Sequence, residues 1–410
     1  MWCAGWLIAA VWAAVFALIP APQPHRVWGM SAGAGYLCAA VAALVSSRRR
    51  GPAVSVWFAA AGAVVVPFVL LLLTGSAQSE VGVMERAGLL TVRQATPYLA
   101  DPGSVVEVTP YLPGMAVFGL PRAVLGGDGL AARLLGDARI WCAAAFLGCL
   151  RAAGRAAESG TYGRRDAARG PMSTCALGAF VASPVVALPL CVSGIDLPLT
   201  GLLVLALVYA ARRRPVATGL ALAAVCSLKW TAWPAVAVAV ALLAQRGGWR
   251  AAARGTAVAV GGTALLVLPA VLLSPGPLVE QVFMFPTGRG PWETPAASPL
   301  PGRLLADLGP AGWYAAVALL LSAGLAVAVS LLTRPPHDLV PAADRLALGL
   351  CAAFLLAPAG RFGYLALPVA LVVLARLVNG TSRSEPERAT VVRGVPSVPP
   401  LTAPAAGSAR

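Results

Sequence analysis

Long apolar segments, separated by clusters of arginine, recur throughout this 410-residue chain. A helix needs roughly 20 mostly apolar residues to cross the hydrocarbon core of a membrane. Hydrophobic residues make up 59% of the chain and charged residues only 11%, against about 25% charged residues in soluble proteins. Too few polar side chains remain to cover a soluble globule of this size. The sequence therefore predicts an all-α, polytopic integral membrane protein and excludes a soluble enzyme, a nucleic-acid-binding domain and a disordered scaffold.

Apolar length sets the number of spans that we expect. Three of the segments, 215–228, 231–245 and 346–358, are shorter than a usual span. The count is therefore about 12, within a range of roughly 10 to 13. The predicted spans lie near residues 2–20, 28–46, 53–74, 130–150, 172–192, 196–211, 215–228, 231–245, 256–274, 311–332, 346–358 and 362–378.

The placement of the arginines predicts the orientation of the chain. Cytoplasmic loops of membrane proteins are enriched in Lys and Arg. If the loop at 48–50 is cytoplasmic, alternation of the spans places both termini and the arginine-rich segments 151–171 and 212–214 on the same side. The net charge of +15 is then explained by topology, and no nucleic-acid partner is needed. We expect a multi-pass protein of the cell membrane with cytoplasmic termini and a surrounding of membrane lipid.

Three regions follow from this arrangement. Residues 1–74 form the N-terminal helices, and residues 75–378 form a second transmembrane region with two long outer loops, 75–129 and 275–310. Membrane connections are usually short, so these loops are candidates for the functional site, and we expect short interfacial or re-entrant helices in them. The tail 379–410 is rich in Ser, Pro, Arg and Thr and is predicted to be a disordered cytoplasmic segment.

Cysteine and histidine content limits the cofactor chemistry. The eight cysteines mostly lie inside apolar segments without C-x-x-C spacing, which is typical of small core residues. Only two histidines are present, so a histidine-rich metal centre is excluded. The sequence indicates no metal site and no cofactor, and it leaves assistance by a divalent cation open.

Two glutamates lie near the start of the first outer loop. Glu80 and Glu85 fall within a segment, 79–93, that can form a helix. On a helix, a separation of five residues corresponds to a rotation of about 500°, so the two side chains point in different directions. One carboxylate can then face a cavity while the other pairs with Arg86 or with solvent. The alternative is that both are solvated loop charges.

Further charged residues lie at predicted outer helix ends. Lys229, the only lysine, interrupts an apolar region beside Trp230 and is either an interfacial lysine or a cation that binds a phosphate headgroup. Arg361 follows a helix break and offers a planar donor fork to phosphate oxygens, or to a loop carbonyl or lipid phosphate. Asp196 either caps the helix that follows it or belongs to the same site. Asp137 and Arg139 are expected to pair with neighbouring charges.

The order of these segments resembles the GT-C fold glycosyltransferases, in particular the actinobacterial polyprenyl-phosphate-mannose-dependent alpha-mannosyltransferase-like proteins. The resemblance covers about residues 75–378 and rests on elements that match in altered form. These are Glu80 with Glu85-Arg86-Ala87-Gly88, then Thr96-Pro97-Tyr98, then Tyr111-Leu112-Pro113, then Lys229 with Pro234, and finally Ala297 to Arg303 with its Ser-Pro-Leu core. Glu80 stands where the family usually has Asp, and Met84 stands where it usually has Tyr.

This resemblance implies a membrane enzyme that moves a hexosyl group, with mannose as the expected sugar, from a polyprenyl-phosphate donor to a hydroxyl of a glycan or glycolipid on the outer face. It implies that Glu80 is the catalytic general base. It further implies that cations balance the charge of the departing phosphate, namely Lys229, Arg361, Arg303 and Arg289. The residues expected to contact substrate are Glu85, Arg86, Tyr98, Tyr111, Asp196 and Trp230.

Two other functions remain open from the sequence. A lipid or solute transporter would place charged residues near the bilayer midplane and broken helices at corresponding positions of two halves. A non-catalytic assembly protein with a GT-C-like fold would share the topology but have lost the chemistry. The clustering of polar residues at outer helix ends favours the enzyme over the transporter.

Overall fold

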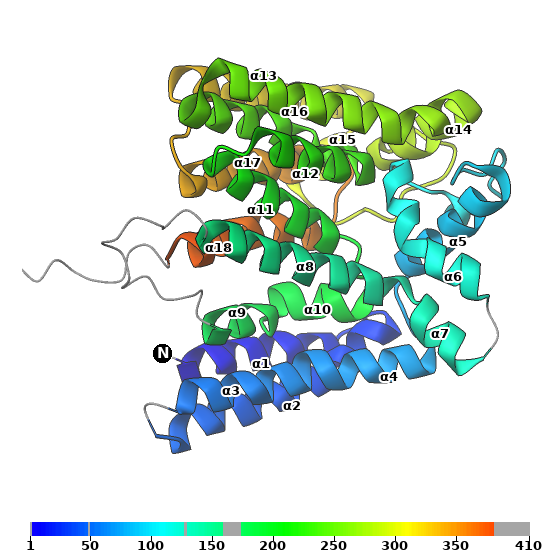
Figure 1. The fold of residues 1–410 in the computed structure, drawn as a ribbon. Helices are drawn as coiled ribbons and strands as arrows, with labels where there is room; N and C mark the ends of the chain where they lie inside the picture. Colours follow the sequence, from blue (N-terminus) through cyan, green and yellow to red (C-terminus); the bar gives the residue numbers. More distant parts are fainter. Residues whose placement is uncertain (1, 48–49, 127–128, 159–173, 381–410) are drawn as a thin grey trace, which may run out of the picture.

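The computed structural model of the protein describes residues 2–47, 50–126, 129–158 and 174–380, and these residues form an all-helical bundle (Figure 1). The predicted tail 379–410 falls almost entirely outside the described residues, as does most of the 151–171 loop. The helices are α1 (Trp2–Leu18), α2 (Gln23–Val45), α3 (Gly51–Ala60), α4 (Val66–Thr74), α5 (Ser79–Gln94), α6 (Leu120–Leu125), α7 (Leu130–Gly136), α8 (Ala138–Glu158), α9 (Thr174–Val181), α10 (Pro184–Val192), α11 (Leu197–Ala211), α12 (Pro215–Leu228), α13 (Pro234–Leu273), α14 (Pro275–Leu278), α15 (Pro301–Ala306), α16 (Pro310–Thr333), α17 (Leu339–Leu356) and α18 (Ala366–Gly380).

Seven helical segments in the described residues are long and apolar enough to cross a membrane. An eighth span results if α9 and α10, which are bent by 57° at their junction, cross together. The polytopic membrane protein is thus supported, but the count of about 12 is not confirmed. The difference arises partly because α1, α11 and α12 are apolar yet only 14 to 17 residues long, which at about 1.5 Å per residue is shorter than a typical hydrocarbon core.

Helix α13 contains two of the predicted spans, 231–245 and 256–274, joined at Gly248. A straight helix of its 40 residues would be about 60 Å long. Gly248 instead adopts a positive φ of 78°, and the side chain of Leu243 lies against Gly255. The ring of Trp233, just before α13, lies 6.0 Å from that of Phe283, which follows α14. The chain therefore turns back at Gly248, and both arms of α13 return to the same end of the bundle.

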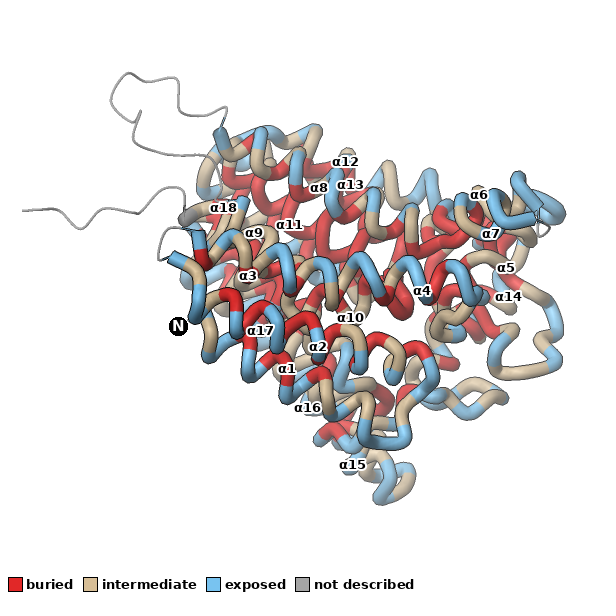
Figure 2. Tube along the Cα trace, turned by 90° about the horizontal axis from the view of Figure 1, so that it is seen from below, coloured by how far each residue is buried: buried red, intermediate tan, exposed pale blue. Residues whose placement is uncertain are grey.

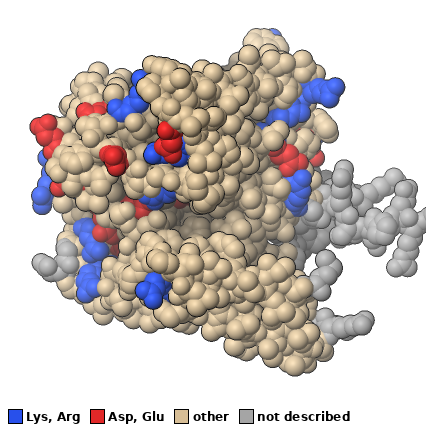
Figure 3. All heavy atoms as spheres, turned by 180° about the vertical axis from the view of Figure 1, so that it is seen from behind, with Lys and Arg blue, Asp and Glu red and all other residues tan. Residues whose placement is uncertain are grey.

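The two ends of the bundle differ in what they carry. The chain starts at one end, where arginines donate to the carbonyls of neighbouring helix ends, for example Arg246 Nε to Ala211 O at 3.2 Å and Arg345 Nη1 to Ser330 O at 2.8 Å. The opposite end, which we call the site end, gathers α5, α6, α7 and α14 (Figure 1). Charged side chains on the face seen in Figure 3 also lie mostly toward the ends of the bundle, and much of the surface between them carries no charged side chain.

Buried residues run through the interior, whereas exposed apolar residues cover the outside (Figure 2). Trp28 and Tyr36 of α2 are fully buried, and the Tyr36 hydroxyl donates to Ala182 O at 2.6 Å. Helix α16 has only two buried residues, Ala316 and Leu331. An outer face of Leu, Val and Ala of this kind would be insoluble in water and matches the apolar interior of a bilayer.

Candidate functional site

The carboxylate of Glu80 and the guanidinium of Arg361 form an ion pair at the site end, although 281 residues separate them in sequence. Glu80 lies in the first turn of α5, and Arg361 lies in the connection between α17 and α18. Residues 296–300 of the second long loop hold this connection in place, because Gly360 N donates to Ala296 O at 2.9 Å and Ser298 N donates to Gly360 O at 3.0 Å. Backbone contacts of this loop segment, which begins the Ala297 to Arg303 element, thus position Arg361.

A second ion pair joins Lys229 to Asp196. Lys229 directly follows α12, and Asp196 directly precedes α11. The side chain of Asp196 does not cap α11 but accepts a hydrogen bond from Lys229 Nζ. Burial lowers the pKa of Lys229, and the charge and hydrogen bond of Asp196 reverse this effect, so that the pKa lies above its ordinary value. The charged form of Lys229 is therefore favoured by the carboxylate of Asp196, with which it pairs.

Tyr111 lies beside Lys229. Lys229 Nζ lies 5.1 Å from the centre of the Tyr111 ring, a cation–π contact. Burial raises the pKa of Tyr111, and the negative charges of Glu80 and Asp196 raise it further. Because the carboxylates of both pairs act on this one phenol, we consider the pairs Glu80–Arg361 and Asp196–Lys229 together and call them the charged cluster.

The segment that carries Tyr111 is fixed on both sides. Leu112 N donates to Leu228 O at 3.0 Å, which places Tyr111 beside Lys229. Tyr98 Oη donates to Tyr111 O at 2.9 Å, and burial raises the pKa of Tyr98. Tyr98 also packs in a small apolar group with Leu112 and Trp230. Tyr98 and Trp230 thus support the cluster through packing.

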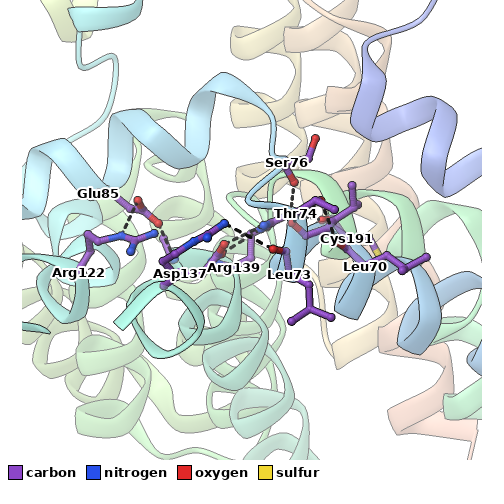
Figure 4. A network of polar contacts seen from close by, with 12 residues as sticks. Leu70, Leu73, Thr74, Ser76, Glu85, Arg122, Asp137, Arg139 and Cys191 are labelled. Atoms are coloured by element: carbon purple, nitrogen blue, oxygen red, sulfur yellow. Dashed lines mark hydrogen bonds and ion pairs between the residues drawn. The ribbon is translucent and has the colours of Figure 1, made fainter. Parts of the chain in front are cut away.

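Arg139 and Asp137 form a buried pair that sequence reasoning did not connect with the site (Figure 4). They pair with each other, as expected, through Nη2 to Oδ2 at 2.8 Å and Nε to Oδ1 at 2.9 Å. Arg139, fully buried on α8, also donates through Nη1 to Ser76 O at 3.0 Å and Cys191 O at 2.8 Å. These carbonyls lie shortly before Glu80 and Asp196 in sequence. Arg139 therefore ties together the two segments that carry the carboxylates of the charged cluster.

Glu85 points away from the charged cluster, as the helical spacing predicts. Its carboxylate pairs with Arg122 Nε at 3.0 Å rather than with Arg86 (Figure 4). Burial raises the pKa of Glu85 despite the opposing hydrogen bond and charge of Arg122. Arg86 instead donates to Val106 O at 2.5 Å. A cavity of about 280 Å³ lies beside Glu85, and Glu80, Lys229, Asp196 and Arg361 are not among its lining residues.

The other predicted phosphate-binding arginines make different contacts. Arg289 stacks over the Trp313 ring, with its guanidinium carbon 3.7 Å from the ring centre. Arg303 pairs with Asp307 at 2.9 Å, one turn along the same segment. Neither of these contacts involves a residue of the charged cluster. In the described part of the chain there is also no group of three or more His, Cys, Asp or Glu side chains placed to hold a metal ion.

Comparison with known proteins assigns the chain to a family. The model of glycosyltransferase family 87 matches residues 109–358, which is more than half of the chain. This region contains Tyr111, Asp196 and Lys229. Glu80 precedes the region and Arg361 follows it in sequence, and the fold brings these two residues together. No curated protein and no solved structure is significantly similar to the chain. With its apolar helical spans and its match to this model, the chain belongs to glycosyltransferase family 87 and is a membrane glycosyltransferase.

Proposed function

We propose that the protein transfers a hexosyl group, with mannose as the expected sugar, from a polyprenyl-phosphate donor to a hydroxyl of a glycan or glycolipid. The observation that supports this most is the charged cluster, in which two cations and two carboxylates from distant parts of the chain meet beside Tyr111. A phosphate leaving group needs positive charge, and a hydroxyl acceptor needs a base. The cluster contains both in one place.

The reaction assigns a role to each group. The acceptor oxygen attacks the anomeric carbon, its proton passes to the Glu80 carboxylate, and the bond between the anomeric carbon and the donor phosphate oxygen breaks. The electron pair of that bond leaves with the polyprenyl phosphate. Arg361 and Lys229 stabilise the developing charge, and preorganised cations of this kind contribute several kcal/mol. Because phosphate is a stable anion, no general acid is required.

Each cation is already balanced by a carboxylate. A donor phosphate that competes for Arg361 would leave Glu80 without its partner, and this would make the carboxylate available as a base at the moment when the donor is bound. Asp196 would keep Lys229 oriented until the same exchange takes place. A charged cluster of this kind therefore suits a phosphate-linked donor.

The position of the cluster along the helices favours an enzyme over a transporter. Its members lie at helix ends, namely in the first turn of α5, before α11, after α12 and between α17 and α18. A transporter site would instead lie near the bilayer midplane, at helix breaks that recur at corresponding positions of two halves of the chain. Under the expected topology the site end faces the outside of the cell, where lipid-linked sugar donors are accessible without a nucleotide pocket.

The proposal is tested with membranes that contain either the wild-type protein or Glu80→Gln, supplied with radiolabelled polyprenyl-phosphate mannose or glucose. Glu80→Gln keeps the shape of the side chain but removes the base, so we expect transfer to fall by at least about 100-fold with normal membrane insertion. The matched control is Glu293→Gln, which alters an exposed glutamate of the second long loop. Transfer by Glu80→Gln at the wild-type rate would remove Glu80 from the mechanism, and absence of transfer by the wild type from both donors would contradict the donor class.

A further inference from the structure

We propose that the cavity beside Glu85 is the acceptor site and that it binds one neutral, hexose-sized sugar unit, such as the terminal sugar of a glycan or glycolipid. The inference rests on the proposed function and adds to it the place and chemical class of the acceptor. The cavity has a volume of about 280 Å³ and is lined by residues of the α4–α5 connection, of α5 itself and of the α6–α8 region.

The two oxygens of Glu80 connect the charged cluster to this cavity. Oε1 accepts from Arg361, whereas Oε2 lies 3.4 Å from the hydroxyl of Ser79, and Ser79 is one of the residues that line the cavity. The carboxylate thus has one oxygen on the cation that would hold the donor phosphate and the other on Ser79 at the edge of the cavity, while Glu80 itself is not a lining residue. An attacking hydroxyl and a departing phosphate must approach the anomeric carbon from opposite sides, so an acceptor in the cavity has the required placement.

The chemistry of the lining suits a neutral polyhydroxyl ligand. Gln78 and Ser79 offer an amide and a hydroxyl, which both donate and accept hydrogen bonds. The lining carboxylates are balanced, because Glu85 pairs with Arg122 and Asp137 pairs with Arg139, and a further lining arginine, Arg133, donates to Leu73 O at 3.5 Å. A phosphate would meet the two carboxylates, and a free cation would meet the arginines. Sugar hydroxyls, in contrast, can donate to carboxylates and accept from guanidinium groups in the same site.

The size of the cavity limits what it can hold. Pockets for small ligands usually measure about 300 to 1,000 Å³, and this cavity lies just below that range. One sugar ring fits, and a longer glycan would extend out of the cavity. The aliphatic part of the lining is provided by Leu72 and Val81, which can pack against the apolar face of a sugar ring.

Gly82 provides a direct test, because it lines the cavity from the interior of α5. A Cβ at Gly82 would meet no heavy atom within 4 Å, so a larger side chain there would enter free space. Leu is a stronger helix former than Gly, so Gly82→Leu should fill the cavity without disturbing α5. Gly148→Leu in α8 is the matched control, since Gly148 is also helical, has the same free space around it and does not line the cavity.

The experiment uses the full chain in detergent and two probes. Methyl α-D-mannopyranoside and methyl α-D-glucopyranoside report on the cavity by saturation-transfer NMR, and undecaprenyl phosphate reports on the charged cluster by native mass spectrometry. We expect at least one glycoside to bind to the wild type, to Gly148→Leu and to Glu80→Gln. Gly82→Leu should bind that glycoside at least tenfold more weakly and should still bind undecaprenyl phosphate. Gly82→Ala should give an intermediate effect.

Two outcomes would overturn the acceptor site. One is that neither glycoside binds the wild type, and the other is that Gly82→Leu leaves glycoside binding unchanged. Failure of the proposed function looks different, because in that case undecaprenyl phosphate does not bind and no sugar is transferred from polyprenyl-phosphate donors, whatever the glycosides do. A fold defect in Gly82→Leu would show as loss of both ligands, and it would be checked against Gly82→Ala, whose binding must still be weakened if the site is correct.

Discussion

At the scale of single residues, Lys229 has the most constrained environment in the charged cluster. Its ammonium is held by Asp196 and lies over the face of Tyr111, and its side chain is only 14% exposed. A buried cation without a carboxylate partner strongly destabilises a protein. The pairing explains why the only lysine of the sequence can be tolerated between two apolar helices.

We predict that Lys229→Met reduces sugar transfer by about 100-fold or more, because it removes a cation from the leaving phosphate. Lys229→Arg should retain part of the activity, since it keeps the charge with a different geometry. Initial rates with a polyprenyl-phosphate sugar donor measure both effects. Equal rates for Lys229→Met and the wild type would show that Lys229 is only an interfacial lysine.

Glu85 leads to a prediction about pH. Burial raises its pKa in the folded state, so between the unfolded and folded pKa values the folded protein binds more protons, and the free energy of unfolding falls as pH rises. Lowering the pH through this window should therefore raise the melting temperature of the wild type relative to Glu85→Gln. Arg122 and Asp137 are the charged groups that act on it. A temperature difference that is independent of pH, or that changes in the opposite direction, would contradict the assigned environment.

At the scale of helices, two close contacts hold α5 in position. The backbone of Gly88 in α5 touches that of Gly119, because a Cβ at Gly88 would lie 2.2 Å from Gly119 C. Arg139 of α8 binds the carbonyls just ahead of α5 and α11. These contacts orient the first turn of α5, where Glu80 lies, toward Arg361.

Two glycines on α5 should respond in opposite ways to the same substitution. Gly88→Ala forces the backbones apart and should destabilise the protein by about 1 to 3 kcal/mol, with reduced transfer. Gly82→Ala meets no neighbour and should leave stability unchanged or raise it by up to about 1 kcal/mol. The melting temperatures of the two variants are compared in detergent, with size-exclusion chromatography as the measure of the folded fraction after heating. Equal melting temperatures would mean that α5 and Gly119 are not in contact.

The buried pair Arg139–Asp137 gives a further test at this scale. Arg139→Met leaves the Asp137 carboxylate buried without its partner and should cost about 3 to 5 kcal/mol of stability. The double variant Arg139→Met with Asp137→Leu removes both charges and should recover much of that stability. We expect transfer to remain low in the double variant, because the Ser76 and Cys191 carbonyls have lost their shared donor. Recovery of both stability and transfer would limit Arg139 to a role in folding.

At the scale of the whole molecule, the sequence could predict the helical membrane class and the approximate position of the long apolar helices. These features follow from local composition. The number of crossing helices could not be predicted from apolar length alone, because α9 and α10 are bent at their junction and α11 and α12, although found where predicted, are shorter than a usual span.

The partners of individual charges were also beyond sequence reasoning. The helical spacing correctly predicted that Glu80 and Glu85 diverge. Their partners, however, are distant in sequence: Arg361 lies 281 residues from Glu80, and Arg122 lies 37 residues from Glu85. Nothing in the local pattern names such distant partners. The role of Arg139 in joining the segments ahead of Glu80 and Asp196 was missed for a similar reason. Its hydrogen-bond acceptors are the backbone carbonyls of Ser76 and Cys191, and every residue type has a backbone carbonyl.

The central claim is that the four charges act as one site for sugar transfer, and a double-mutant cycle tests it most directly. Initial transfer rates from a polyprenyl-phosphate sugar would be measured for wild type, Glu80→Gln, Lys229→Met and the double variant. Residues of one catalytic unit show strongly non-additive effects, so we predict that the double variant is hardly slower than the slower single variant. Losses that multiply, or single variants as fast as the wild type, would contradict the claim.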